Sequence, residues 1–259
     1  MDIIVCCKQI IDPEIPPSNL KIDETGKKII TPSGTASVIS PFDMHAVEAA
    51  LRIKDKLSGK ITILSLGNNF VREVVKKPLA MGADELILLE DEAFDGLDSW
   101  AAAHALAAAI RKIGRYDLIL CGRQAADWDN GQVGIGIAEF LGIPAVTLAK
   151  QIEIVDTKVR IERLLPDGYE TIETILPALI TVTNELGDPR YASVKGVLAA
   201  KKKTPTIWNK TDISLDVPHS KLLKVFQPIK EKQCQMVKAD NPAEAGAKLA
   251  LKLREAKAV

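Results

Sequence analysis

The chain has 259 residues, 47% hydrophobic and 26% charged, which is the composition of an ordinary globular protein and not of a disordered one. Its 34 Lys and Arg residues balance 34 Asp and Glu residues, so no net charge would attract it to nucleic acid or to an anionic membrane. No apolar run reaches the roughly 18 residues of a membrane span, and the N-terminus lacks the features of a signal peptide, so we expect a cytoplasmic protein.

The first 150 residues alternate between strand and helix signals. Short apolar runs predict strands at 2–7, 60–66, 85–89 and 117–121. Helices are predicted from Ser40 to Gly59, over 69–81 with a kink or late start at Pro78, from Asp98 to Gly114, and from Gly131 to Leu141. Repeated units of this length favour an α/β fold with a doubly wound, mostly parallel sheet.

The first of these helices has a distinct start. Ser40 stands at the cap position, Pro41 lies just inside it, and the acidic Asp43 follows three residues after the serine, which is typical of a capped helix. The preceding stretch, 12–41, contains Pro and Gly and is too irregular to predict any element.

The pattern changes after Val146. Strands are predicted at 152–155, 158–163, 171–175 and 179–183 with no helix between them, and we expect them to extend the sheet as a β-rich second layer. A loop and short helix follow, then a stretch with little periodicity, then an amphipathic helix that begins at Asn241-Pro242. The predicted organisation is an α/β nucleotide-binding domain at 1–203, with a core at 1–150, a β-rich extension at 151–183 and a loop and helix at 184–203, followed by an arm at 204–259.

The most informative segment runs from Cys121 to Gly134, with the sequence CGRQAADWDNGQVG. It follows an apolar strand and precedes a helix, so it lies at the carboxyl end of the sheet, where open α/β sheets bind ligands. Free backbone N–H groups at the start of the next helix favour a phosphate. The polar side chains offer a positive charge (Arg123), amide groups (Gln124, Gln132) and helix-capping or hydroxyl contacts (Asp127, Asn130). A surface loop with an Asp or Asn cap is the alternative interpretation.

Several other kinds of site are not indicated. The triplet Gly134-Ile135-Gly136 lacks the third glycine of a dinucleotide fingerprint, and no GxxxxGK[ST] loop occurs. The three histidines are dispersed without ligands at metal-binding spacing, the four cysteines show no CxxC spacing, and no Ser-His-Asp set can be assembled. We therefore expect neither a metal site nor a catalytic residue.

Several separated segments together resemble the electron-transfer flavoprotein β subunit family. They occur in the family's order over about 1–205, so the resemblance is specific. The segments are Val5-Cys6-Cys7-Lys8-Gln9, Ser40-Pro41-Phe42-Asp43, Ala46 to Ala50, Leu79 to Asp84, Gly122-Arg123-Gln124-Ala125 through Gln132, Asp188 to Ala192, and Ala199 to Lys203.

The resemblance implies where a cofactor binds. In this family an adenine nucleotide lies against the first strand, the S/N-P-F turn, the end of the second strand and the G-x-Q-A loop. The matching positions of this chain are Cys6, Ser40, Pro41, Phe42, Asp43, Leu66, Gly122, Arg123, Gln124, Ala125, Ala126, Asp127, Trp128, Asp129, Asn130, Gly131, Gln132, Val133 and Gly134. Arg123 is expected to tune a flavin or to contact its phosphates.

The resemblance also bears on which nucleotide is bound. In the family the α subunit carries one FAD in a mobile domain, and the β subunit holds either AMP or a second FAD. AMP-type members tend to have Thr at the position of Val133, whereas members similar to electron-bifurcating flavoproteins read Q-V-G, as this chain does. An apolar side chain gives a terminal phosphate nothing to bond, and Gly134 and Gly136 leave room for backbone donors to a diphosphate. FAD is expected here, with AMP as the alternative.

FAD at this position implies flavin-based electron bifurcation. NADH would donate a hydride, one electron would pass to ferredoxin, and the other would pass through the α-subunit FAD to an acyl-CoA dehydrogenase-type flavoenzyme. The alternatives are an AMP-binding β subunit of a non-bifurcating flavoprotein and an adenine-nucleotide-binding stress-type protein. The related ATP-pyrophosphatases would need an S-G-G-x-D-S turn, which is absent.

The resemblance extends to contacts with partners. Segment 184–203 is similar to the loop and helix that dock onto the dehydrogenase, and it implies docking contacts from Pro189, Arg190, Tyr191 and Val194. The family's anchor is a leucine, so Val194 would bury less apolar surface; alternatively, Val194 packs beneath its own helix. The arm at 204–259 is expected to embrace the α subunit.

Overall fold

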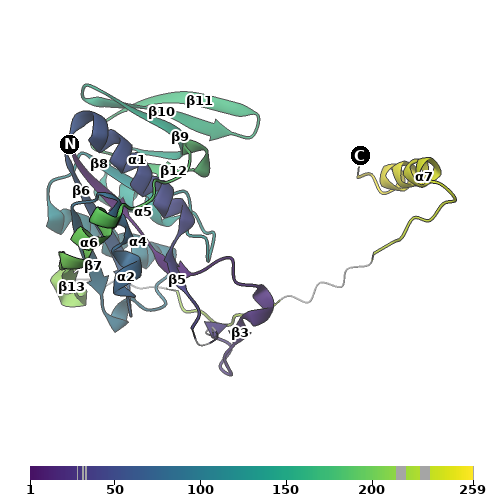
Figure 1. Ribbon diagram of the computed structural model, residues 1–259, viewed down its shortest axis with the longest axis horizontal. Coiled ribbons are helices and arrows are strands. Elements are labelled where there is room, and N and C mark those ends of the chain that lie inside the picture. The colour runs from purple at the N-terminus through teal and green to yellow at the C-terminus, as the bar shows by residue number, and fades with distance from the viewer. Residues whose placement is uncertain (28, 31, 33, 214–219, 228–233, 259) are drawn as a thin grey trace. The chain divides into compact units, whose positions relative to one another are not determined.

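A computed structural model describes residues 1–27, 29–30, 32, 34–213, 220–227 and 234–258 (Figure 1). The chain divides into two units, Met1–Lys224 and Val225–Val259, each considered by itself.

Apolar runs of the first unit form one large sheet. Its strands are β1 (Asp2–Cys6), β6 (Lys60–Gly67), β7 (Glu85–Glu90), β8 (Leu118–Gly122), β9 (Ala145–Val155), β10 (Lys158–Leu165), β11 (Gly168–Ile175), β12 (Ala178–Val182) and β13 (Thr206–Trp208). They are arranged in the order β11-β10-β9-β12-β8-β1-β6-β7-β13. The strands from β12 to β13 pair in parallel, whereas β10 pairs antiparallel with both of its neighbours. The predicted doubly wound, mostly parallel α/β sheet is confirmed.

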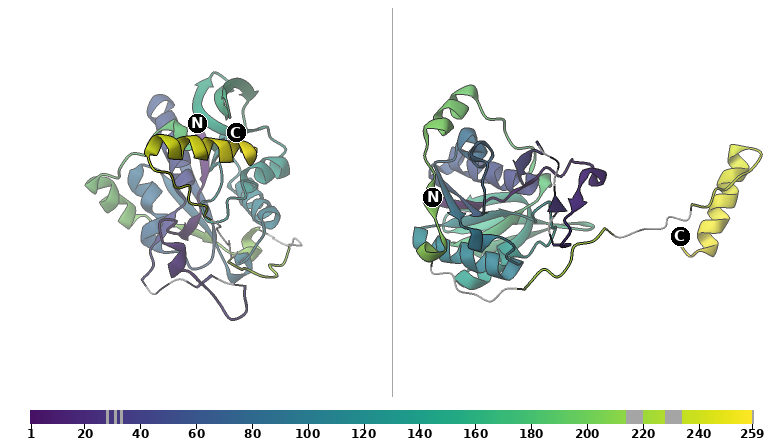
Figure 2. Two further views of the ribbon diagram at one scale, coloured as in Figure 1. Left: turned by 90° about the vertical axis from the view of Figure 1, so that its right-hand side faces the viewer. Right: turned by 90° about the horizontal axis from the view of Figure 1, so that it is seen from below.

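Helices cover both faces of this sheet (Figures 1 and 2). They are α1 (Pro41–Leu57), α2 (Arg72–Val75), α3 (Lys77–Met81), α4 (Ser99–Ile113), α5 (Val133–Leu141) and α6 (Val194–Lys202), with short 3-10 turns η1 (Pro17–Asn19), η2 (Glu92–Phe94), η3 (Asn184–Leu186) and η4 (Lys210–Ile213). Buried residues of α1 and α3 form one apolar cluster with the sheet, and those of α4 and α5 form another with its opposite face. The two clusters make the sheet the middle layer of three.

Local sequence signals account for most helix boundaries. The carboxylate of Asp98 accepts a hydrogen bond from the backbone N–H of Ala101 and caps α4, and Gly114, with φ of 90°, ends that helix. Pro78 lacks the N–H that would continue the preceding turn, so the predicted helix over 69–81 is divided into α2 and α3.

The predicted β-rich extension of the sheet is confirmed, but its expected arrangement as a second layer is wrong. Strands β9, β10 and β11 continue the same sheet, and β12 returns to its middle, where it pairs in parallel with β8 and β9. The reason is burial, because all five residues of β12 are buried, as a strand covered on both faces requires.

The stretch predicted to be irregular contains short strands. Within it, β3 (Lys21–Ile22) pairs with β4 (Ile29–Ile30), and β5 (Ser37–Ile39) pairs with β2 (Gln9–Ile11), which lies just before the stretch. At the edge of the main sheet, β13 adds a strand that was also not predicted. Strands of two or three residues are too short for an alternating pattern to reveal them.

The second unit contains helix α7 (Pro242–Glu255). Asn241 caps it by accepting a hydrogen bond from the backbone N–H of Glu244, as its Asn-Pro start predicts. None of its side chains is buried. Among the residues that the structure describes, no helix has both the length and the apolar character needed to cross a bilayer.

Candidate functional site

The candidate site lies where the direction of chain connection in the sheet reverses. Strand β1 has β6 on one side and β8 on the other, and the chain proceeds through β6 and β7 before it crosses to β8. Open α/β sheets bind ligands at the carboxyl ends of the two strands beside such a reversal. Here those ends are Cys6 and Gly122.

The side chain of Asp43 joins these two strand ends. Its carboxyl oxygens accept hydrogen bonds from the backbone N–H of Lys8 at 2.8 Å and from that of Gly122 at 3.1 Å. Asp43 is only 6% exposed. Burial raises the pKa of Asp43 to about 7, although the two backbone hydrogen bonds and the charge of Lys8 lower it in part. The buried carboxyl group therefore holds the segment after β1 and the end of β8 together.

Ser40 and Asp43 do not cap α1 in the way that the sequence predicts. Ser40 occupies the cap position, but its side chain makes no cap hydrogen bond. Instead its hydroxyl oxygen accepts a hydrogen bond from the backbone N–H of Ala126 at 3.3 Å. Both side chains thus hold the loop after β8, because this loop approaches the first turn of α1 closely.

The loop between β8 and α5 is fixed by contacts of its own. Asp129 has a positive φ of 54°, and its carboxylate accepts a hydrogen bond from Gln124 Nε2 at 2.7 Å. Lys8 Nζ lies 2.7 Å from a carboxylate oxygen of Asp127, so an ion pair links the segment after β1 to this loop. The cofactor residues inferred from the sequence do not include Lys8. The available signal was its position directly after the first strand.

Arg123 is the cationic group of the loop. Its guanidinium lies over the ring of Phe42 at 4.6 Å, and its backbone N–H donates to the carbonyl oxygen of Val182 at 2.9 Å. Its Nε is buried and has no hydrogen-bond partner within the described part of the chain. Because a buried N–H without a partner is costly, this atom fits an acceptor such as a phosphate oxygen or a flavin carbonyl.

The start of α5 completes the site. Gln132 makes no side-chain cap hydrogen bond, and the N–H groups of the first helical turn have no helical partners. Val133, the first helical residue, packs against the apolar cluster on the α4 side of the sheet. A Cβ on Gly134 would lie 3.1 Å from Thr181 Cγ2, so the helix begins directly against β12. The N–H groups and Arg123 together suit an anionic ligand.

The other predicted cofactor residues surround the loop after β8 in different ways. Cys6 pairs in register with Cys121 and is buried. Leu66 lies two residues further along its strand than Leu64, the partner of Cys6 in the register. Trp128 is exposed, and Asn130 Nδ2 donates to Ser99 Oγ of α4 at 3.3 Å. Gly131 has a positive φ of 63°, which favours glycine.

The predicted docking residues divide into two groups. Tyr191 is 99% exposed and Val194 is 79% exposed, so the alternative that Val194 packs beneath its own helix is wrong. Arg190 turns inward and forms ion pairs with Glu48 and Asp55 of α1, and Pro189 beside it is partly buried.

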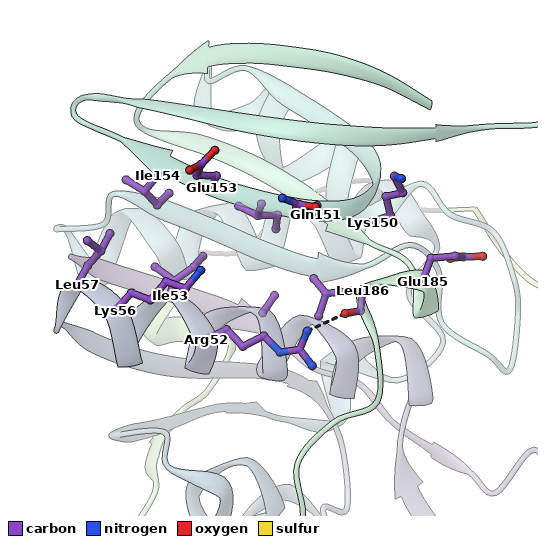
Figure 3. A pocket seen from close by; sticks show the side chains of 12 residues that line it. Arg52, Ile53, Lys56, Leu57, Lys150, Gln151, Glu153, Ile154, Glu185 and Leu186 are labelled. Atoms are coloured by element: carbon purple, nitrogen blue, oxygen red, sulfur yellow. Dashed lines mark hydrogen bonds between the residues drawn. The ribbon is translucent and has the colours of Figure 1, made fainter. Parts of the chain in front are cut away.

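A separate groove of about 480 Å³ lies between α1, β9 and η3 (Figure 3). Apolar side chains such as Ile53 and Ile154 line it, and Arg52 donates to the carbonyl oxygen of Leu186 at its side. None of the predicted cofactor residues lines this groove.

The sequence of the chain is similar to those of known electron-transfer proteins. The family model described as "Electron transfer flavoprotein domain" matches residues 28–213. The chain is 40% identical over 264 residues to "Caffeyl-CoA reductase-Etf complex subunit CarD" of Acetobacterium woodii, covering 98% of each chain. It is 44% identical over 217 residues to "Electron transfer flavoprotein subunit beta" of Thermoanaerobacterium thermosaccharolyticum, covering 83% of this chain and 81% of the relative. It is 37% identical over 212 residues to "Acryloyl-CoA reductase electron transfer subunit gamma" of Anaerotignum propionicum, covering 78% and 75%.

Proposed function

The chain belongs to the electron transfer flavoproteins as a β-type subunit, and we propose that it holds FAD at the carboxyl ends of β1 and β8. We further propose that it pairs with a flavin-binding α subunit and takes part in NADH-dependent electron bifurcation. Ferredoxin and an acyl-CoA dehydrogenase-type flavoenzyme would be the two acceptors. The names of two relatives, which mention caffeyl-CoA reductase and acryloyl-CoA reductase, support the link to acyl-CoA chemistry.

One observation supports the proposal that a nucleotide binds at this loop. The Nε of Arg123, which has no hydrogen-bond partner among the described residues, belongs to the loop that follows β8, and the open first turn of α5 ends that loop. Hydrogen-bond donors from a cationic side chain and from a helix N-terminus are the groups that bind phosphates in proteins. Lys8 lies beside the loop as well, where its charge is balanced by the ion pair with Asp127.

Val133 supports FAD over AMP. Its side chain packs on the core and carries no donor for a terminal phosphate. A Cβ on Gly136 would lie 2.8 Å from Ala103 Cβ, so this glycine lets α5 pack closely against α4, and its own N–H donates to the carbonyl oxygen of Gln132. The N–H groups of Val133 and Gly134, in the first turn of α5, would be the backbone donors to a diphosphate. The resemblance to the family supports the same choice, since its AMP-type members tend to have Thr at this position.

The residues of this chain would position the cofactor, exclude water from it and set its local charge. When bound, FAD would supply hydride acceptance from NADH and one-electron transfer to the acceptors. The stacked guanidinium of Arg123 would hold a positive charge in place beside the flavin or its phosphates. Asp43 would keep the two strand ends at a fixed separation through its backbone hydrogen bonds.

The exposed side chains of Tyr191 and Val194 support docking of the dehydrogenase-type flavoenzyme on the loop before α6 and on its first turn. Aromatic and aliphatic side chains that protrude in this way commonly anchor protein interfaces. The unit Val225–Val259, whose helix buries no side chain, would embrace the α subunit.

Nucleotide analysis of the purified complex with its flavin-binding subunit tests this proposal. We expect two FAD per pair of subunits after denaturation and chromatography, and full bleaching of both flavins by excess NADH. One FAD and one AMP per pair would instead identify the AMP-binding, non-bifurcating type. A complex that contains no flavin would refute the proposed function altogether.

A further inference from the structure

Four side chains of α1 lie along one stripe of that helix and contact a single loop. His45, Glu48, Arg52 and Asp55 are spaced by three, four and three residues, which places them on the same face. The loop is 186–190, between η3 and α6. His45 Nδ1 lies 3.1 Å from the carbonyl oxygen of Gly187, and Arg52 donates to the carbonyl oxygen of Asp188 at 3.4 Å. Arg52 also donates to the carbonyl oxygen of Leu186 at 2.7 Å (Figure 3).

Glu48 is the centre of these contacts. Its Oε2 accepts hydrogen bonds from Arg190 Nε at 2.9 Å and from the backbone N–H of Arg190 at 3.0 Å. Its Oε1 accepts from Arg190 Nη2 at 3.2 Å and from Arg52 Nε at 2.8 Å. One carboxylate therefore binds both the side chain and the backbone of the loop residue, and a second arginine of its own helix.

Because Glu48 is buried, its carboxylate depends on these hydrogen bonds in place of water. Glu48 is only 3% exposed, whereas Asp55, the other carboxylate on Arg190, lies at the surface. Burial alone would raise the pKa of Glu48, but the hydrogen bonds from Arg190 and Arg52 outweigh it and hold the pKa below its ordinary value. The carboxylate stays charged, and removal of its charge would deprive the partly exposed guanidinium groups of Arg190 and Arg52 of the carboxylate that they share.

The loop leads directly to exposed apolar side chains. Tyr191 follows Arg190, and Val194 and Leu198 protrude from α6 one turn apart. The body of α6 is fixed independently, since a Cβ on Gly196 would lie 2.2 Å from the carbonyl oxygen of Ala80 in α3. Lys203 at its end donates to the carbonyl oxygen of Asp84 at 2.7 Å. The contacts with α1 described above are made by the loop before α6 and not by the helix itself.

We propose that Glu48 is a positioning residue for partner docking, which holds Arg190 so that Tyr191, together with the independently fixed Val194, forms a preformed surface for an acyl-CoA dehydrogenase-type flavoenzyme. This inference rests on the docking function proposed above. A preformed surface binds more tightly than a mobile one, because the loop then loses less conformational entropy when the complex forms.

The experiment compares Glu48→Gln with the unchanged protein, both in complex with the flavin-binding subunit. Glutamine keeps the size of the side chain but removes the charge, so the fold is retained; circular dichroism and the nucleotide content check this. Amide hydrogen exchange at residues 187–191 measures how firmly the loop is held. Steady-state electron transfer, with the acyl-CoA dehydrogenase-type flavoenzyme from the same cells as the varied substrate, measures docking.

Two further variants serve as controls. Glu85→Gln makes the same chemical change in an exposed ion pair with Lys60, so neither readout is expected to change. Val194→Asp places a charge on the proposed docking surface without touching Glu48. It therefore tests the docking function by itself.

We expect Glu48→Gln to accelerate exchange at residues 187–191 by about tenfold or more, and to raise KM for the flavoenzyme about tenfold while kcat changes by less than about twofold. Unchanged exchange, or faster exchange with an unchanged KM, would overturn the role of Glu48. If Val194→Asp raises KM but Glu48→Gln does not, only this inference fails. If Val194→Asp leaves KM unchanged, the docking function itself is wrong and the inference fails with it.

Discussion

A carboxyl oxygen of Asp43 lies 3.1 Å from the backbone nitrogen of Gly122, so the first turn of α1 touches the end of β8. A side chain at position 122 would occupy the same space, because a Cβ there would lie 2.6 Å from Asp43 Oδ1. The glycine and the buried aspartate thus depend on each other. The loop that begins at Gly122 is the one to which we assign the cofactor.

The stability of the protein should depend on pH through Asp43. Its carboxyl group titrates at about 7 in the folded chain and near 3.8 in the unfolded chain, so between these values the folded protein binds a proton that the unfolded chain lacks. The free energy of unfolding that Asp43 contributes therefore falls as pH rises from about 4 to 7, by up to about 1.4 kcal/mol per pH unit, and is constant above that range.

The variant Asp43→Asn lacks this titrating group and tests whether it makes the protein less stable as the pH rises. Urea unfolding of both proteins at several pH values should show that the stability of the unchanged protein, relative to the variant, declines from pH 5 to pH 7. Lys8, Asp127 and Cys7, which surround the carboxyl group, remain the same in both proteins. Parallel stability curves would contradict the raised pKa.

Gly122→Ala should destabilise the protein by about 2 kcal/mol, the usual cost of forcing an extra group into a tightly packed position. Backbone atoms of Phe42 and Asp43 lie in the way, at 2.7 and 2.8 Å from the new Cβ, and cannot move without shifting α1. Gly168→Ala is the matched control, since nothing lies within 4 Å of that Cβ. Chemical denaturation of both variants measures the difference, and equal effects would contradict the close approach.

Sequence patterns predict elements whose signals are local. Asp98 and Gly114 bound α4 because a cap and a positive φ depend only on neighbouring residues. The place of β12 in the middle of the sheet depends on pairing with β8, 60 residues earlier, which no local pattern contains. Asp43 looked like a capping residue for the same reason, since its partners Lys8 and Gly122 are distant in sequence. The inward turn of Arg190 toward Glu48 was equally hidden.

Much of the candidate site followed from resemblance and from its place in the strand–helix pattern. The loop after β8 lies at the carboxyl end of the sheet as predicted, since the apolar strand and the helix on either side of it were visible in the sequence. Lys8 was not predicted as part of it, because its ion pair with Asp127 spans 119 residues.

Arg123→Ala should lower the FAD retained by the purified complex, because the variant loses both the buried donor and the charge stacked on Phe42. We expect a loss of affinity of about tenfold or more, from a charge-assisted hydrogen bond worth about 1.5–3 kcal/mol. Arg115→Ala is a suitable control, since Arg115 is largely exposed and pairs with Asp2 near the amino end of β1. Unchanged flavin content together with an unchanged rate of reduction by NADH would contradict a role for Arg123 at the cofactor.

Val133→Thr should shift nucleotide selection toward AMP. The new hydroxyl would stand at the first residue of α5, where it could donate to a terminal phosphate, but it would also place a polar group against the apolar cluster. A loss of stability of about 1 kcal/mol is expected from that burial. Chromatography of nucleotides released from the complex should show a higher ratio of AMP to FAD than for Val133→Ala. An equal ratio in the two variants would contradict the role of this position in selection.

Helix α7 should contribute to association with the flavin-binding subunit and little to the stability of the unit Met1–Lys224. Leu249 and Leu253 lie one turn apart on a stripe with Ala245, and both remain exposed. Burial of two leucines in a partner contributes about 3 kcal/mol or more, so replacing both with aspartate should weaken heterodimer formation about a hundredfold or more. Isothermal titration with the flavin-binding subunit measures this, while thermal unfolding of the isolated chain should stay within about 2 °C. Lys248→Gln alters the same helix without removing an apolar group, and an equal effect of that variant would show that the stripe is not the contact surface.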